Sequence, residues 1–206
     1  MAHYFDENPQ AGHQIRYVET RLGGQDFQFK TDQAVFSRNH LDFGSELLIT
    51  TVAAEPMVPT GRLLDLGCGY GPVGIVMKRL FPALDVVLCD INTRALALAT
   101  DNAAANQTRY LEIVQSDGLQ ALTGDFDLIL TNPPIRAGKA TVYRFYSESA
   151  AHLRPEGRLY VVIRKKQGAP STLERLQSLF HRVDVIEKSG GFWIIRAAQP
   201  ILTDER

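Results

Sequence analysis

From Arg62 onward, short apolar stretches alternate with longer segments in which apolar residues recur at helical spacing. The stretches "RLLDLG", "LDVVLCD", "LEIVQSD", "FDLILTN" and "RLYVVIRKK" are typical of buried strands. The segments "GPVGIVMKRLF", "TRALALATDNAAANQ", "VYRFYSESAAHL" and "STLERLQSLF" are typical of helices. Apolar strands that alternate with helices favour a mostly parallel sheet with both faces covered.

Proline, glycine and hydroxyl residues mark the expected ends of these helices. Pro82 ends the first helix, and Pro155 and Gly157 close the third. Ser171 or Thr172 is expected to cap the start of the fourth, because a hydroxyl oxygen can accept from a free backbone N–H of the first turn.

Two glycine pairs predict hairpins at the two ends of the chain. "RYVETRLGGQDFQFK" alternates polar and apolar residues around Gly23-Gly24, and the helical segment "LDFGSELLITTVA" follows it. "RVDVIEKSGGFWIIRAAQ" places two strands around Gly190-Gly191. So short a turn requires antiparallel strands, because a parallel crossover needs a dozen residues or more. We therefore predict an α/β fold: a doubly wound, mostly parallel seven-stranded sheet that ends in an antiparallel hairpin, with a short N-terminal β-hairpin/helix extension.

The composition is that of a globular domain with a full core. The chain has 206 residues, of which 45% are hydrophobic and 22% charged. Its two cysteines lie in or beside apolar runs, and its five histidines form no evident cluster, so we expect neither a disulfide framework nor a metal site. The polar start "MAHYFDENPQ" is unlike a signal peptide, and no apolar run approaches the ~18 residues of a membrane span. A cytoplasmic protein without membrane association is expected.

Charge is distributed unevenly along the chain. Residues 1–135 carry nine Lys/Arg and sixteen Asp/Glu, whereas residues 136–196 carry twelve Lys/Arg and five Asp/Glu. A basic C-terminal third is compatible with a polyanionic partner, although scattered solvated charges would give the same count.

The glycine-rich turn after the first strand of the sheet is a candidate ligand site. Gly67, Gly69 and Gly71 lie just past "RLLDL", and ligands of such sheets bind beyond the carboxyl ends of the strands. "GYGPVG" also matches the dinucleotide pattern G-x-G-x-x-G. Asp65, however, precedes the glycines, and an acid there would repel a pyrophosphate but suit a cationic ligand.

Two further acids end the next two strands. Asp90 follows "VVLC", about where a ribose-binding acid is expected, and can accept from two hydroxyls. Asp117, in "QSDG", could accept from an adenine amine. Three acids at three strand ends suit a ligand that contains ribose and adenine and is cationic rather than phosphorylated. S-adenosylmethionine meets that description.

The motifs "DLGCGYG", "LCDIN", "SDG" and "TNPPI" resemble successive motifs of the class I S-adenosylmethionine-dependent methyltransferases. With the lead-in "TDQAVFSRNHLDFGSELLI", the chain more narrowly resembles the small methyltransferase-domain family, which includes the small-subunit (16S) ribosomal RNA guanine-N2 methyltransferases. The resemblance extends from about Tyr4 to Gln199. It implies a Rossmann-like fold, S-adenosylmethionine as cofactor, and cofactor contacts from Asp65, Gly67, Cys68, Gly69, Gly71, Asp90, Ile91, Asp117, Gly118 and Asn132.

The resemblance also implies a division of the chain. Residues 1–55, the hairpin and helix, would cover the cleft and pack on the S-adenosylmethionine-binding domain of residues 56–206. Longer relatives carry an extra N-terminal domain that helps to bind substrate, so a monomer and a homodimer both remain open for this chain.

Asn132-Pro133-Pro134, at the end of the fourth strand, indicates transfer to a planar nitrogen. The lone pair of such a nitrogen is delocalised, and the nitrogen becomes nucleophilic as it pyramidalises. The Asn132 side-chain oxygen and the Pro133 carbonyl are two acceptors for the amine hydrogens, and the prolines restrict the backbone that holds them. Orientation and preorganised electrostatics would then be the main catalytic terms, with no strong base needed.

Four residues are candidate substrate contacts. Relatives often have Tyr or Phe after N-P-P, where the ring can stack on the base, but this chain has Ile135. Phe36, in the lead-in, is a candidate for that stacking, and a role as a core anchor is equally open. Arg136 and Lys139 follow on an Ala-Gly hinge and could contact phosphates near a flipped-out base. Arg164, Lys165 and Lys166, at the end of the fifth strand, would add three more cations beside Arg136 and Lys139.

Four functions compete for these residues. The first is methylation of RNA, with guanine N2 of small-subunit ribosomal RNA as the family-level expectation and ribosomal RNA or the small subunit as partner. The second is methylation of a protein glutamine amide or of adenine N6, since both nitrogens are planar. A nicotinamide-dependent oxidoreductase would use the G-x-G-x-x-G match, but Asp65 and the antiparallel final hairpin disfavour it. A non-catalytic cofactor- or RNA-binding module is disfavoured by the intact Asn132-Pro133-Pro134.

Overall fold

The structure of the chain is a computed structural model, which describes residues 15–32, 41–56 and 60–201. Seven strands form the central sheet in the order β5-β4-β3-β6-β7-β9-β8. Their bounds are β3 Arg62–Leu66, β4 Asp85–Asp90, β5 Leu111–Gln115, β6 Phe126–Thr131, β7 Leu153–Arg164, β8 Phe180–Ser189 and β9 Phe192–Pro200. All neighbouring strands are parallel except β9, which runs antiparallel to both β7 and β8. The predicted doubly wound sheet with a final antiparallel hairpin is confirmed.

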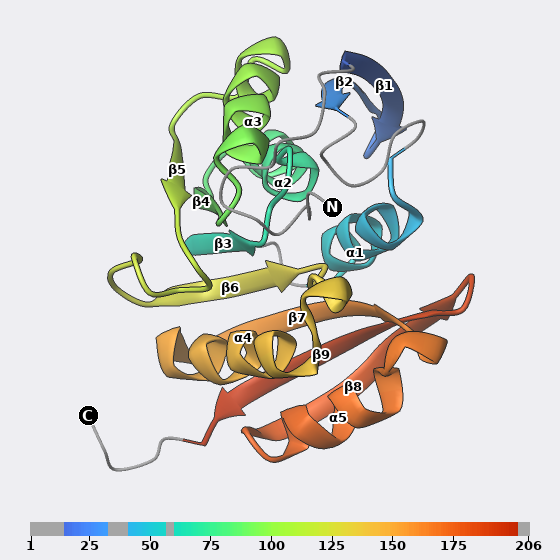
Figure 1. Ribbon diagram of the computed structural model, residues 1–206, viewed down its shortest axis with the longest axis vertical. Coiled ribbons are helices and arrows are strands. Elements are labelled where there is room, and N and C mark those ends of the chain that lie inside the picture. Colours follow the sequence, from blue (N-terminus) through green and yellow to red (C-terminus); the bar gives the residue numbers. More distant parts are fainter. Residues whose placement is uncertain (1–14, 33–40, 57–59, 202–206) are drawn as a thin grey trace.

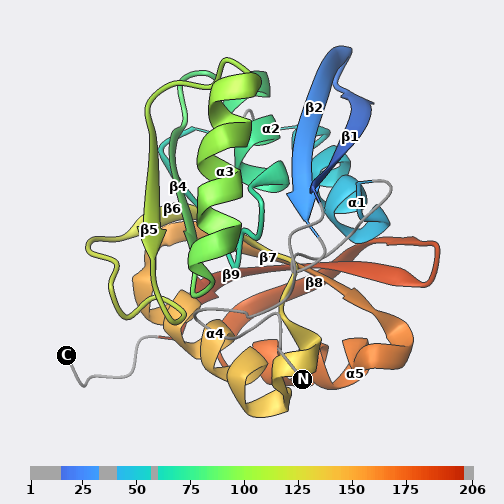
Figure 2. The ribbon, with the colours of Figure 1, turned by 45° about the horizontal axis from the view of Figure 1, so that its top comes forward.

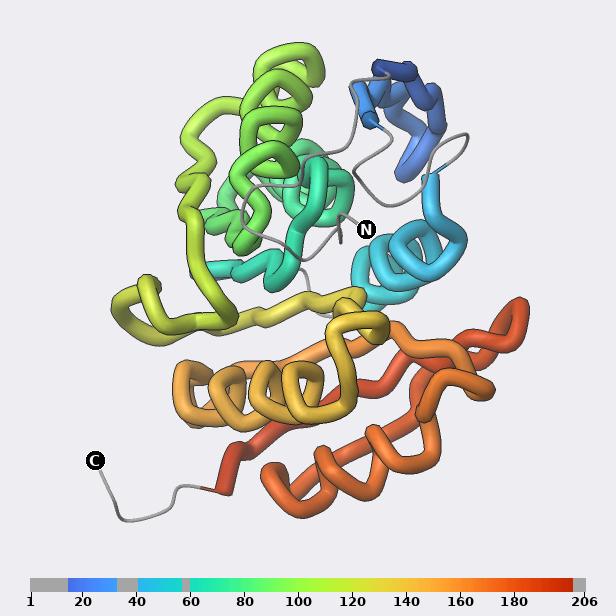
Figure 3. The backbone as a smooth tube through the Cα atoms, viewed as in Figure 1, coloured from blue at the N-terminus to red at the C-terminus, as the bar shows by residue number. Residues whose placement is uncertain are grey.

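Helices cover both faces of the sheet. The helices α1 (Phe43–Ala53), α2 (Pro72–Leu80) and α3 (Thr93–Ala105) lie on one face, and α4 (Lys139–His152) and α5 (Ala169–Gln177) lie on the other (Figure 1). The tube in Figure 3 follows the chain from β5 to β6 through an irregular connection. None of the described helices is long and apolar enough to cross a membrane.

Alternation along the strands divides the core into two layers. Leu63 of β3 and Leu128 of β6 belong to the cluster under α1, α2 and α3, whereas their neighbours Leu64 and Ile129 belong to the cluster against α4 and α5. Successive side chains of a strand point to opposite faces, so a strand buried on both faces must be apolar at nearly every position. That is why these strands appear in the sequence as continuous apolar runs.

The N-terminal hairpin consists of β1 (Ile15–Leu22) and β2 (Gln25–Asp32), joined by Gly23-Gly24 as predicted. Both glycines have positive φ, 56° and 78°, as a two-residue hairpin turn of right-handed twist requires. Figure 2 shows the hairpin beside α2 and α3. It lies on the helical layer and does not join the central sheet.

Two asparagine side chains of α3 attach β2 to the main domain. Asn102 accepts from the N–H of Lys30 (2.6 Å) and donates to its carbonyl (2.9 Å), as a neighbouring strand would. Asn106 makes the same pair with Gln28, at 3.1 and 2.8 Å. Asn102 also donates to the carbonyl of Tyr70 in the glycine turn, at 2.9 Å. The buried side-chain amide of Asn102 therefore bonds both the N-terminal hairpin and the glycine turn.

Two predicted helix starts are wrong. The last helix, α5, begins at Ala169 with Gly168 as its N-cap, in place of Ser171 or Thr172. Gly168 has φ of 113°, and the Ser171 hydroxyl donates back to the Gly168 carbonyl, so it does not cap a free N–H. The preceding helix, α4, begins at Lys139, three residues before the predicted segment.

The predicted fifth strand is displaced towards the N-terminus. It begins at Leu153, directly after α4, and includes Pro155 and Gly157, which were expected to close the preceding helix. Leu153 pairs with Phe126 across an irregular register before regular pairing resumes with Leu128. Tertiary pairing has thus extended the strand through residues that disfavour strand structure by themselves.

Candidate active site

The register of the sheet brings the predicted site residues to one edge. Leu66, the last residue of β3, pairs with Cys89 on one side and with Thr131 on the other. The next residue of each strand segment is Gly67, Asp90 or Asn132. Strands that run parallel end on the same side of the sheet, so the glycine turn, the second acid and the N-P-P segment are neighbours.

Hydrogen bonds to β4 hold the glycine turn. The N–H groups of Gly67 and Cys68 both donate to the Cys89 carbonyl, each at 2.9 Å. The N–H of Gly69 donates to Asp90 Oδ2 at 2.9 Å. The turn is therefore fixed by the strand that carries the second acid.

Gly71, directly before α2, has a conformation and a surrounding space that suit only glycine. Its φ is 89°, and a Cβ there would lie 2.9 Å from Ile75 Cδ1 and 3.0 Å from Leu88 Cδ2. Gly71 is the N-cap and has no side chain to accept from the first turn of the helix. Asp65 supplies the missing acceptor, because its Oδ2 accepts from the N–H of Gly74 at 2.8 Å.

Asp65 is a buried carboxylate in a site with few compensating charges. Burial raises its pKa to about 7; the hydrogen bond from Gly74 acts in the opposite direction, and the charge of Asp90 adds to the rise. Burial also raises the pKa of Asp90, against hydrogen bonds from Asn92, Gly69 and Ile91. Two desolvated acids on adjacent strands favour a cation or hydroxyl groups beside them and disfavour a phosphate.

Asp90 joins the glycine turn to the start of α3. Its Oδ1 accepts from the N–H of Asn92 at 2.9 Å, while its Oδ2 binds Gly69. Asn92 in turn caps α3 by accepting from the N–H groups of Arg94 and Ala95, at 3.0 and 3.2 Å. A carboxylate offers about four acceptor sites, so Asp90 can still accept from a ribose hydroxyl. Ile91, between the two polar residues, is half-buried.

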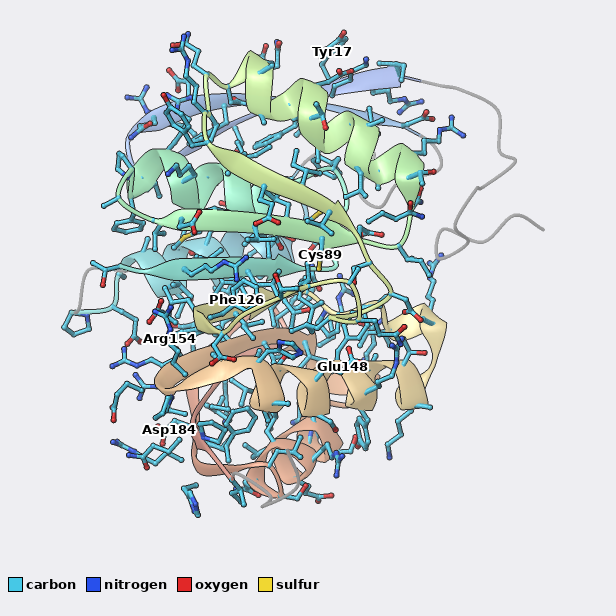
Figure 4. All side chains as sticks on the ribbon, turned by 90° about the vertical axis from the view of Figure 1, so that its left-hand side faces the viewer. Tyr17, Cys89, Phe126, Glu148, Arg154 and Asp184 are labelled. Atoms are coloured by element: carbon cyan, nitrogen blue, oxygen red, sulfur yellow. The ribbon has the colours of Figure 1, made fainter. Side chains whose placement is uncertain are left out.

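Side chains of α4 fix the loop that contains Asp117 and Gly118. Arg144 forms an ion pair with the Asp117 carboxylate and binds Glu148 at 3.1 Å. Glu148 accepts from the N–H of Leu119 at 2.9 Å, and a Cβ on Gly118 would overlap the Glu148 carboxylate. Figure 4 shows Glu148 on α4 and Cys89 in the sheet. Sequence reasoning missed the Arg144 and Glu148 clamp, which only the fold brings to this loop.

Both thiols near the site are buried and free. Burial raises the pKa of the Cys68 thiol and of the Cys89 thiol. Each therefore stays protonated at neutral pH and is a poor nucleophile. Among the described residues, no group of three or more His, Cys, Asp and Glu side chains could hold a metal ion.

The N-P-P segment forms a tight turn at the end of β6. Pro134 has φ of −73° and ψ of 78°, and the N–H of Ile135 donates to the Pro133 carbonyl at 2.8 Å. This is an inverse γ-turn, which fixes the direction of that carbonyl. A carbonyl oxygen has two lone pairs, so one remains for a ligand.

Asn132 is held through its amide nitrogen. Nδ2 donates to Asp42 Oδ2 at 2.8 Å and to Ser45 Oγ at 3.1 Å. Asp42 is the N-cap of α1 and also accepts from the N–H of Ser45 at 3.0 Å. Sequence reasoning missed both partners, although an Asp directly before a helical apolar pattern is a recognisable N-cap.

The candidate substrate contacts differ in their exposure to solvent. Ile135 is half-buried and packs against the core layer of α4 and α5. Arg136 is exposed, and Lys139 is exposed with its ammonium 5.0 Å from the Tyr143 ring centroid. The Ala-Gly hinge stays a prediction: Ile135–Ala137 form a 3-10 helix, Lys139 begins α4, and Gly138 lies between them with φ of 96°. Phe36 lies outside the described residues.

Aromatic and basic side chains lie together at the same edge of the sheet. Phe43, the first residue of α1, is 45% exposed, and its ring centroid lies 5.7 Å from that of Phe192. The Arg164 guanidinium lies 4.6 Å from the Phe192 centroid. Lys165 and Lys166 are exposed in a 3-10 helix and do not extend the strand as predicted. We call Phe43, Arg164, Lys165 and Lys166 the rim.

The chain is similar to known proteins over most of its length. The chain matches the family described as methyltransferase small domain over residues 26–196. It is 43% identical to an uncharacterized protein of Bacillus subtilis, YbxB, over 95% of this chain and 97% of that protein. It is 37% identical to ribosomal RNA small subunit methyltransferase C of Pasteurella multocida, over 77% of this chain and 48% of that enzyme.

A solved structure has a similar fold. It is the 16S rRNA N2 G1207 methyltransferase RsmC of T. thermophilus in complex with AdoMet and guanosine. The TM-score is 0.81 at 24% identity, and the match covers 93% of this chain and 52% of that one. This chain thus spans about half the length of the ribosomal RNA methyltransferases that it resembles.

Proposed function

The chain belongs to the methyltransferase small domain family, and on that premise we propose that it methylates an exocyclic amine of RNA, with guanine N2 of small-subunit ribosomal RNA as the target. The enzyme class, an S-adenosylmethionine-dependent methyltransferase, follows from the family. The choice of RNA and of the guanine amine is our proposal. In it the protein acts in the cytoplasm, as a monomer or a homodimer.

The residues of the site suit S-adenosylmethionine, which supplies an electrophilic methyl group on a sulfonium when bound. Asp90 can accept from a ribose hydroxyl while it holds Gly69. The buried charge of Asp65 favours a cationic ligand nearby. Asp117, in the loop held by Arg144, is our proposed acceptor for the adenine amine, and Gly67, Cys68, Gly71, Ile91 and Gly118 form the surrounding backbone.

The proposed reaction rests on the orientation of the Asn132 side-chain amide. Both hydrogens of its amide nitrogen are directed at Asp42 and Ser45, so the carbonyl end is the end left for a substrate. Oδ1 would accept one hydrogen of the target amine, and the spare lone pair of the Pro133 carbonyl would accept the other. Two fixed acceptors align the nitrogen lone pair with the methyl group and favour its pyramidal form.

RNA is favoured by the charges around this site. The rim adds three exposed cations at the carboxyl edge, and Arg136 and Lys139 add two more beside the N-P-P turn. Phosphate contacts from Lys and Arg position a strand without reading its sequence. We propose that Phe43, an exposed ring on the residue after Asp42, replaces the missing aromatic after N-P-P as an edge on which a flipped base rests.

The test is methylation by the purified protein with methyl-labelled S-adenosylmethionine and small ribosomal subunits from cells that lack the gene. The product is digested separately with nuclease and with protease, and the nucleosides are separated. Label in N2-methylguanosine supports the proposal. Label in another nucleoside would support RNA as the substrate but contradict guanine N2 as the target. Protease-sensitive label would indicate a protein amide as the target and contradict the proposal.

A further inference from the structure

We propose that Asp42 is a positioning residue for methyl transfer: it fixes which end of the Asn132 amide faces the substrate. The inference rests on the proposed role of Asn132 as an acceptor for the target amine. The geometry that carries it is a cluster of three side chains, Asp42, Ser45 and Asn132, which come from α1 and from the end of β6.

The orientation of a primary amide at such a site has to be enforced. Its oxygen and nitrogen ends are nearly the same size, so packing alone hardly distinguishes them. An Asn132 turned the wrong way would present N–H groups to a substrate amine that also carries hydrogens. Two donors cannot bond each other, and the acceptor on which the reaction depends would be absent.

Asp42 enforces the orientation because its Oδ2 is an acceptor held at a fixed position beside Asn132. Its Oδ2 lies 2.8 Å from Asn132 Nδ2, and a reversed amide would place two acceptor oxygens at that distance. The same oxygen accepts from the N–H of Ser45 at 3.0 Å and from its hydroxyl at 3.4 Å. The Ser45 hydroxyl thereby turns a lone pair to Asn132, which donates to it at 3.1 Å.

The position of Asp42 is itself fixed by the fold. It is the N-cap of α1, and Ser45 is buried in the first turn of the same helix. Gly44, between them, is buried so tightly that a Cβ would lie 2.9 Å from Asp42 Oδ2 and 2.9 Å from the Phe192 ring. The start of α1 is thus part of the active site: capping the helix and orienting the catalytic amide are tasks of one carboxylate.

Three substitutions separate positioning from helix capping. Asp42→Ser keeps a good N-cap but shortens the side chain, so that its oxygen no longer reaches the Asn132 amide. Asp42→Asn keeps the length and an acceptor oxygen, which the N–H of Ser45 holds in the position of Oδ2. Glu46→Gln removes another carboxylate from the first turn of α1 and serves as the matched control.

Activity is measured as kcat and KM on whichever substrate the wild type methylates, with cofactor affinity from calorimetry. Asp42→Ser is expected to lower kcat by about 10- to 100-fold, with cofactor Kd and melting temperature near those of the wild type. Asp42→Asn is expected to restore kcat to within about fivefold of the wild type, and Glu46→Gln to leave it within about twofold. An unchanged kcat in Asp42→Ser, or equal losses in the Ser and Asn variants, would overturn the inference.

A second readout needs no substrate. The side-chain NH₂ of Asn132, assigned by its disappearance in Asn132→Ala, is followed by NMR in the free protein. We expect slow exchange with solvent in the wild type and in Asp42→Asn, and fast exchange in Asp42→Ser. If the wild type fails to methylate RNA while this pattern is seen, the proposed substrate fails and the positioning role stands; fast exchange in the wild type refutes the positioning role itself.

Discussion

Asp90 Oδ2 accepts a hydrogen bond from the backbone N–H of Gly69 at 2.9 Å, which joins the acid at the end of β4 to the glycine turn after β3. The same carboxylate accepts from the N–H of Asn92 through its other oxygen. One side chain therefore shapes the turn, supports the start of α3 and can still accept a hydrogen bond from a ligand. Its removal should affect folding and cofactor binding together.

Asp90→Ala is expected to weaken S-adenosylmethionine binding by more than about tenfold and to lower the free energy of unfolding by roughly 1–3 kcal/mol, because two buried N–H groups lose their acceptor. Calorimetric titration and denaturant unfolding measure the two effects. Asp85→Ala, at the exposed opposite end of the same strand, is the control and should change neither. Wild-type affinity in Asp90→Ala would refute the assignment of this acid to the cofactor.

The buried charge of Asp65 predicts a stability that depends on pH. Its pKa is about 7 in the folded protein against an ordinary value of 3.8, so the folded protein holds this proton more tightly than the unfolded chain does. The contribution to stability is complete below pH 3.8 and is lost as the pH rises through about 7. Asp65→Asn keeps an oxygen for the N–H of Gly74 and removes the charge.

At pH 8, Asp65→Asn is therefore expected to be more stable than the wild type by roughly 1–3 kcal/mol, with a smaller difference at pH 5. It should also bind the cationic cofactor more weakly. Urea unfolding at both pH values, with calorimetry for the cofactor, measures this exchange of affinity for stability. A stability difference that stays constant from pH 5 to pH 8 would show that Asp65 does not titrate in this range.

The sheet was the most predictable part of this molecule. Buried parallel strands require continuous apolar runs, and "FDLILT" or "DVVLCD" carries that signal locally. The strand β7 was placed less well, because Pro155 and Gly157 disfavour strand structure and only pairing with β6 and β9 overrides them. The start of α5 was misplaced because Gly168 caps it by its backbone conformation, which the hydroxyls of Ser171 and Thr172 obscured.

The candidate site was predictable where a motif lies on one strand end. Asp65 and Asp90 lie at the carboxyl ends of β3 and β4, and Asn132 comes directly after β6, so the strand pattern alone locates them. The partners of these residues come from distant parts of the chain, so sequence spacing carried no sign of them. Asp42 lies 90 positions from Asn132, and Arg144 lies 27 positions from Asp117.

The hydrogen bonds from the Asn102 and Asn106 side chains of α3 to β2 predict that the N-terminal hairpin unfolds with the main domain. Asn102→Ala should lower the free energy of unfolding by roughly 2–4 kcal/mol, because the backbone groups of Lys30 and Tyr70 lose their hydrogen bonds to Asn102. Amide hydrogen exchange should show β2 losing its protection. Asp101→Ala, which removes only the exposed ion pair with Lys30, should cost less than about 1 kcal/mol. Unchanged protection of β2 in Asn102→Ala would contradict this attachment.

The rim predicts a salt-dependent contribution to RNA binding. Replacing Lys165 and Lys166 by Ala should raise the KM for RNA and reduce the dependence of binding on salt, because fewer counterions are released. Cofactor affinity should not change. The control removes two exposed arginines, Arg154 and Arg182, near the opposite edge of the sheet. Equal effects of the two double substitutions would mean that net charge acts and that the rim is not a docking surface.

Phe43 provides a separate test of how the base is held. Phe43→Leu keeps an apolar side chain against Phe192 but removes the exposed ring. Stacking of a base on an aromatic ring contributes roughly 1–3 kcal/mol, so kcat/KM should fall by about tenfold or more with an unchanged cofactor Kd. Phe43→Tyr, which keeps the ring, should remain near the wild type. Loss of activity in both variants would place Phe43 in the packing of α1 and not in substrate binding.

The central claim is that Asn132 presents its side-chain oxygen to a guanine amine of small-subunit ribosomal RNA. The most direct measurement is nucleoside mass spectrometry of that RNA from cells that lack the gene, complemented with the wild type or with Asn132→Ala. We predict that N2-methylguanosine falls when the gene is absent, returns with the wild type and does not return with Asn132→Ala, although the variant still binds S-adenosylmethionine. An unchanged content of N2-methylguanosine without the gene, or full restoration by Asn132→Ala, would contradict the claim.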